Sequence, residues 1–95
     1  MRALETYHYT FESSGTHTFD LANNKPSQLL VKNLTNNNIS VSYGTTIDTT
    51  HDSYSYIPKN TAEILGYNVI DASAGVKVTV QAEGTGMVEL RILEF

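Results

Sequence analysis

The stretch YHYTFESSGTHTFDL, from Tyr7 to Leu21, alternates apolar and polar side chains on both sides of a short turn. Alternation with a period of two predicts β-strands with one buried face, because successive side chains of a strand point to opposite sides. We expect the two halves to form a hairpin whose three-residue loop, Ser14–Thr16, pairs Phe11 with Phe19. A two-residue loop would mismatch both faces, so this register requires Gly15 to adopt a positive φ. The side chains on the predicted apolar face are Tyr7, Tyr9, Phe11, His17, Phe19 and Leu21.

The remainder of the chain continues this alternation between polar turns. Segment 28–34 is too apolar to be an edge strand with both faces in water. Segment 61–72 is ambiguous, but Gly66 and its β-branched neighbours favour two short strands, broken near that glycine, over a helix. The residues that the alternation predicts to face inward are Ile39, Val41, Tyr43, Val76, Val78, Val80, Val88, Leu90 and Ile92. In the last strand Met87, Leu93 and Phe95 would also be covered if both faces were buried.

About eight strands follow at roughly 8–12-residue spacing, with turn residues between them. This pattern is typical of an antiparallel sandwich or a small barrel. We therefore predict an all-β fold, a single small antiparallel β-sandwich of jelly-roll or Ig-like type. Residues 1–95 would form one domain, since a chain of this length holds a single core.

The composition is neutral and polar. Ser, Thr and Asn fill 28 of the 95 positions, the net charge is −4 and there is no cysteine. The six Lys and Arg residues are spread singly along the sequence, whereas nucleic-acid binders concentrate them, so we expect no nucleic-acid partner. We also expect no signal peptide and no membrane span, because no long apolar run is present.

The loop before the fifth predicted strand holds the most reactive-looking group of side chains: Asp48, His51 and Asp52. Three such ligands could bind a metal ion, but they share one polar loop and fit no established ligand spacing. Asp and Thr are also the residues that turns prefer. We therefore expect a connecting loop, with no metal and no cofactor.

Tyr54 and Tyr56 follow this loop and share one face of a strand at period two. If that face is exposed, the two rings form a contact surface for a protein or a glycan, since tyrosine is enriched at interfaces. If it faces inward, they belong to the core. The residues leave both alternatives open.

No catalytic arrangement emerges from the sequence. No serine stands in a Gly-x-Ser-x-Gly elbow, and His8, His17 and His51 are separated from one another. His17, on an apolar face, is expected to be a packed or rim histidine and not a catalytic base. We predict that the protein is not an enzyme.

The segment LLVKNLTNNNISVSYGTTIDTTHDSYSYIPKNTAEIL, followed by GVKVTVQAEGTGMVELRILEF, resembles the small accessory virion proteins of tailed bacteriophages. These proteins tend to contain a strand ending in Val-x-Asn, an Ile-x-Val-x-x-Gly strand, a turn with Pro or Gly and a final strand close to VRVLE. The matching positions here are Val31–Asn33, Ile39–Gly44, Ile57–Asn60 and Leu90–Glu94. The loop between Tyr43 and Ile57 departs from the pattern, because it is rich in Thr, Asp and Tyr where the family often has glycine.

The resemblance implies a non-enzymatic virion structural protein, made in the host cytoplasm. Its expected role is that of a capsid decoration protein or an accessory head or tail subunit. Its partners would be other virion proteins and further copies of itself in a homo-oligomer. The alternative is a carbohydrate- or receptor-binding module that uses Tyr54, Tyr56 and the Asp48–Asp52 loop.

Overall fold

A computed structural model describes residues 3–21, 27–50, 54–65 and 76–94 of the chain. Over these residues the protein is all-β, with eight strands and no helix, as the sequence predicts. The strands are β1 (Ala3–Phe11), β2 (Gly15–Leu21), β3 (Ser27–Thr35), β4 (Ile39–Tyr43), β5 (Ser55–Ile57), β6 (Thr61–Leu65), β7 (Val76–Ala82) and β8 (Gly86–Glu94). The second strand predicted beyond Gly66 lies outside the described residues. Within the described ranges, no helix is long and apolar enough to cross a membrane.

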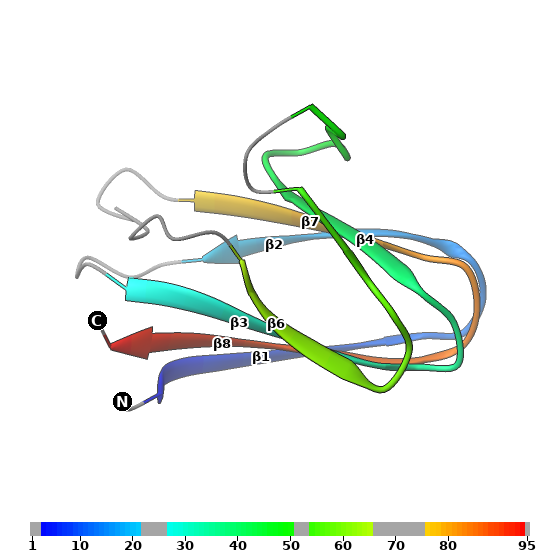
Figure 1. The fold of residues 1–95 in the computed structure, drawn as a ribbon, viewed down its shortest axis with the longest axis horizontal. Helices are drawn as coiled ribbons and strands as arrows, with labels where there is room; N and C mark the ends of the chain where they lie inside the picture. The colour runs from blue at the N-terminus through cyan, green and yellow to red at the C-terminus, as the bar shows by residue number, and fades with distance from the viewer. Residues whose placement is uncertain (1–2, 22–26, 51–53, 66–75, 95) are drawn as a thin grey trace.

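The strands form two four-stranded antiparallel sheets, in the orders β1-β8-β3-β6 and β2-β7-β4-β5. Figure 1 shows them as two layers, with β2, β7 and β4 in one and β1, β8, β3 and β6 in the other. Strand β1 pairs with β8, β2 with β7, β3 with β6 and β4 with β5. The chain therefore resembles one long hairpin wound around the core. This order is that of a jelly roll, which decides between the two predicted sandwich types.

The predicted hairpin between the first two strands is wrong. Phe11 pairs with Gly86 of β8, and Phe19 pairs with Val78 of β7, so β1 and β2 belong to different sheets. Gly15 begins β2 without a positive φ. The alternation is nevertheless correct, because Phe11 and Phe19 both point inward and are buried. The chain turns a corner between the layers, and each strand finds its partner near the C-terminus.

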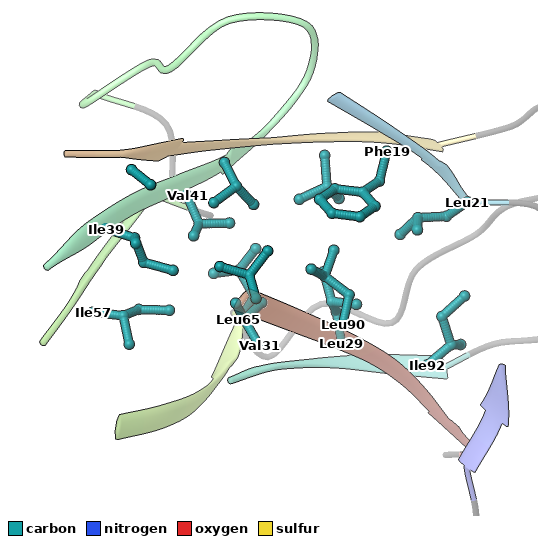
Figure 2. Close-up of a cluster of buried hydrophobic side chains, with 14 of the residues drawn as sticks. Phe19, Leu21, Leu29, Val31, Ile39, Val41, Ile57, Leu65, Leu90 and Ile92 are labelled. Atoms are coloured by element: carbon teal, nitrogen blue, oxygen red, sulfur yellow. The ribbon is translucent and has the colours of Figure 1, made fainter. Parts of the chain in front are cut away.

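The core lies between the two sheets (Figure 2), where apolar side chains from both layers point toward one another. Val78, Val80, Val88, Leu90 and Ile92 are fully buried, so in β8 the first of the two predicted inward sets is correct. Strand β3 lies between β8 and β6, which confirms that it is not an edge strand. Each large apolar side chain buried in this way contributes about 1.5–3 kcal/mol relative to exposure.

A buried amide ties the two layers together at one end of the sandwich. The Asn33 side chain in β3 donates from Nδ2 to the carbonyl oxygens of Asn37, at 2.8 Å, and Ile57, at 2.9 Å. Its Oδ1 accepts from the backbone N–H of Thr35 at 2.9 Å and lies 2.6 Å from the Thr35 hydroxyl. In the described part of the chain, no buried side-chain nitrogen or oxygen lacks a partner. The polar side chains buried in this part of the sandwich are therefore satisfied within the protein.

Candidate functional site

The loop that carries Asp48 folds back over the outer face of the β2-β7-β4-β5 sheet. The Thr79 hydroxyl donates to the carbonyl oxygen of Gly44 at 2.7 Å, and the Ser42 hydroxyl donates to that of Thr46 at 3.1 Å. Ser42 also accepts from the backbone N–H of Asp48 at 3.1 Å. As a result Ser42 and Thr79 are buried, although they lie on the outer face of their strands. This part of the loop is thus a structured cover of the sheet.

The carboxylate of Asp48 is used within its own turn. Its Oδ1 accepts from the backbone N–H of Thr50 at 3.0 Å and from the Thr50 hydroxyl at 2.7 Å. This is the turn-forming use of aspartate. His51 and Asp52 lie outside the described residues, so the structure places one of the three loop candidates. Among the residues that it does describe, no group of three or more His, Cys, Asp or Glu side chains could hold a metal ion.

Tyr54 and Tyr56 point away from the core, the exposed alternative of the two that the sequence left open. Ile57 of β5 is fully buried, and the preceding Tyr56 is 58% exposed. The Asn38 side chain donates to the Tyr56 hydroxyl at 3.0 Å, and the Tyr54 hydroxyl lies 3.4 Å from that of Ser40. The two rings form a partly exposed polar-aromatic strip along the edge strand of this sheet.

A surface that the sequence reasoning missed lies on the outer face of the β1-β8-β3-β6 sheet. Backbone pairing places His8, Glu89 and Lys32 side by side in one row across β1, β8 and β3. The flanking rows are Arg91, Leu30 and Ile64 on one side, and Met87 and Leu34 on the other. We call this surface the Glu89 face; it consists of His8, Leu30, Lys32, Leu34, Ile64, Met87, Glu89 and Arg91.

The carboxylate at the centre of the Glu89 face has three basic neighbours. Arg91 Nε donates to Glu89 Oε2 at 2.7 Å, Lys32 Nζ lies 3.2 Å from the same oxygen, and His8 Nε2 lies 2.8 Å from Oε1. An ionised carboxylate only accepts, so His8 Nε2 carries the hydrogen of its bond. The Arg91 hydrogen bond, supported by His8 and Lys32, lowers the pKa of Glu89 to about 2 against the opposing effect of burial. Glu89 is therefore ionised at any physiological pH.

Two large apolar side chains remain in water on this face. Leu34 and Ile64 are each 46% exposed. Both belong to sheet strands held by the core, so their positions are fixed before any partner arrives. Periodicity could have identified them as outward residues, but no local signal indicates that residues near 8, 32 and 90 share one surface. That proximity comes from the pairing of β1 with β8 and of β8 with β3.

A shallow depression of about 380 Å³ lies at the β1–β2 corner, lined by residues 9–16. Beside it the His17 ring stacks on Tyr9, with ring centroids 3.8 Å apart, and meets Phe19 edge-on. His17 thus packs against aromatic rings, as predicted for a histidine on an apolar face.

No protein-family model, curated protein or solved structure gives a significant match to this chain. Over the described residues, fold and surface therefore define its class: an eight-stranded jelly-roll sandwich with two differently built outer faces, one polar and aromatic, the other apolar around an ion cluster centred on the buried Glu89.

Proposed function

We propose that this protein is a non-enzymatic virion structural subunit, a capsid decoration protein or an accessory head or tail protein that binds other virion proteins. The observation that carries the proposal is the Glu89 face, where exposed apolar side chains surround a preformed ion cluster. Jelly rolls occur in viral capsid and lectin domains, which is compatible with the proposal, although a fold does not by itself define a function. The sequence resemblance to accessory virion proteins of tailed bacteriophages points the same way.

Binding would proceed by surface complementarity. Leu34 and Ile64 serve as apolar anchors, and the charged row between them gives orientation. Because sheet residues are already ordered, little conformational entropy is lost when a partner covers them. A particle offers many equivalent sites, so a modest interface is sufficient when several copies bind together.

Self-association into a homo-oligomer is part of the proposal and would use a different surface. Strands β1 and β2 stand at the edges of their sheets. Edge strands carry backbone N–H and C=O groups that can pair with a neighbouring subunit. A lattice or ring of such subunits would leave the outer sheet faces available to other proteins.

Quantitative mass spectrometry of density-purified particles from the producing lysate tests the proposal. We expect the chain to co-sediment with particles at a fixed ratio to the major shell protein, while an abundant host protein of similar size is depleted as the control. A ratio near one indicates decoration of the lattice, and a much lower ratio indicates a neck, tail or fibre position. Absence from purified particles would refute the proposed function.

A carbohydrate- or receptor-binding module remains the second candidate, favoured by one observation: Tyr56 is 58% exposed beside Tyr54 on a sheet face. Exposed tyrosine rings can stack on sugar rings. Tyrosine fluorescence, with the chain titrated against a panel of glycans, tests this candidate, and the Tyr56→Ser variant serves as the control. A change in tyrosine fluorescence that the wild-type chain shows and the variant loses would support the module. No change with any glycan of the panel would count against it.

A further inference from the structure

The charge that the Glu89 face presents to water is positive. Glu89 itself is almost covered, with 9% of its side chain exposed, whereas His8, Arg91 and Lys32 are 51%, 40% and 33% exposed. Counting Lys32, Arg91 and Glu89, and taking His8 as neutral, the face carries one net positive charge. The whole chain has a net charge of −4. This face is thus a local cationic surface on an acidic protein.

The basic groups keep donors for a second carboxylate. Arg91 donates to Glu89 through Nε. The two terminal nitrogens of its guanidinium form an edge that can bind a second carboxylate in a bidentate manner. Lys32 has three N–H donors and directs one toward Glu89. Glu89 therefore holds both cations in place from beneath without occupying all of their N–H donors.

The same charge argues against a second copy as the occupant. Two Glu89 faces stacked on each other would bring their exposed cations together across a desolvated layer, and the repulsion between like charges opposes that arrangement. Nucleic acid is also a poor fit. Phosphate binding relies on many cations, whereas the rows beside this cluster carry Leu30, Leu34 and Ile64.

We propose that the Glu89 face docks an acidic protein surface, a segment that presents a carboxylate between apolar side chains. The carboxylate would bind Arg91 and Lys32, and the flanking apolar groups would cover Leu34 and Ile64. This inference rests on the proposed function in one respect: the protein that supplies the segment is taken to be a virion protein.

Titration of the isotope-labelled full chain with short synthetic peptides, followed by backbone amide NMR, tests the surface directly. The probe is a capped peptide of alternating leucine and glutamate. Its matched controls are a leucine–lysine peptide, a serine–glutamate peptide and a short DNA duplex. We expect the leucine–glutamate peptide to shift amides of β3, β6 and β8 on the Glu89 face, and the three controls to do so much more weakly.

Two variants make the test specific. Lys32→Gln removes one cation and Ile64→Ser removes one apolar anchor, and each should weaken binding of the leucine–glutamate peptide about fivefold. Lys77→Gln is the matched control, because Lys77 is also a strand lysine with a carboxylate partner, Asp20, but both residues belong to the β2-β7-β4-β5 sheet. It should leave the affinity unchanged. Both test positions are partly exposed, so the variants are expected to fold, and thermal unfolding checks this.

The inference is overturned if the leucine–glutamate peptide shifts no amides, shifts amides elsewhere, or binds the two variants as well as the wild type. It is also overturned if the lysine peptide or the DNA binds this face as strongly. Concentration-dependent shifts on the same face without peptide would assign it to a second copy instead. Since the titration needs no particles, a chain that binds the probe but is absent from particles refutes only the proposed function. A particle-bound chain that ignores the probe refutes only the docking surface.

Discussion

Replacing Glu89 with glutamine should destabilise the fold, and the structure gives the size of the effect. The pKa of this carboxyl falls from 4.5 to about 2 on folding, which corresponds to at most about 3.4 kcal/mol at 1.36 kcal/mol per pH unit. The three basic side chains are a third to a half exposed, so solvent screening reduces the expected net loss to about 1–2 kcal/mol. Glutamine keeps the shape of the side chain, so the loss reports mainly the charge.

The effect has a defined pH dependence. The pKa of Glu89 is lower in the folded than in the unfolded chain, so its contribution is fully present above about pH 4.5. As the pH falls from about 4.5 to about 2 the folded carboxylate becomes protonated and the contribution is lost. The wild-type chain should therefore lose stability over this range by more than the Glu89→Gln variant does.

Urea unfolding of both chains, followed by circular dichroism at neutral pH and near pH 2, measures the two free energies. The control is Glu63→Gln on β6 of the same sheet, where the side chain is exposed and a change below about 0.5 kcal/mol is expected. The reasoning would be refuted if Glu89→Gln left stability unchanged at neutral pH. A gap between wild type and variant that persisted undiminished near pH 2 would refute it as well.

Three further predictions follow from other parts of the structure and use the same unfolding assay. Asn33→Ala leaves buried backbone groups without partners and should cost about 3 kcal/mol, against less than about 0.5 for the exposed Asn36→Ala; equal effects would contradict the buried network. Gly86→Ala should cost at least about 2 kcal/mol, because Gly86 has a φ of 129° and an added Cβ would lie 2.3 Å from the Cα atom of Thr35. Gly15→Ala should be tolerated, because an added Cβ there meets no atom within 4 Å. Tyr56→Phe should change stability by less than about 0.5 kcal/mol, and a larger loss would contradict the exposed position of Tyr56.

Some features of the candidate sites follow from neighbouring residues in the sequence, and others do not. The preference of aspartate for turns is a local property, and Asp48 follows it, since its carboxylate accepts from Thr50 two positions away. The sequence left the direction of Tyr54 and Tyr56 open, because period two gives a shared face without saying which face. The structure assigns them outward by burying Ile57, the next residue along β5, against the opposite layer.

The Glu89 face could not be derived from the sequence. Its central contact joins His8 and Glu89, which are 81 residues apart, and Lys32 reaches the same carboxylate from the strand on the other side. In the sequence these residues are isolated polar positions on the solvent-exposed faces of three strands. Only the registers of β1 with β8 and of β8 with β3 make them neighbours.

By itself the sequence determines the all-β class and, for β1, β2, β4, β7 and β8, which side chains face the core. The reason is that a strand's two faces follow from its own backbone, so alternation needs no knowledge of the partner. The tertiary structure alone decided which strands pair, replacing the expected pair of Phe11 and Phe19 with pairs to Gly86 and Val78. Both arrangements bury the same side chains, so the hydrophobic pattern cannot distinguish them. The choice depends on how the whole hairpin winds to close one core.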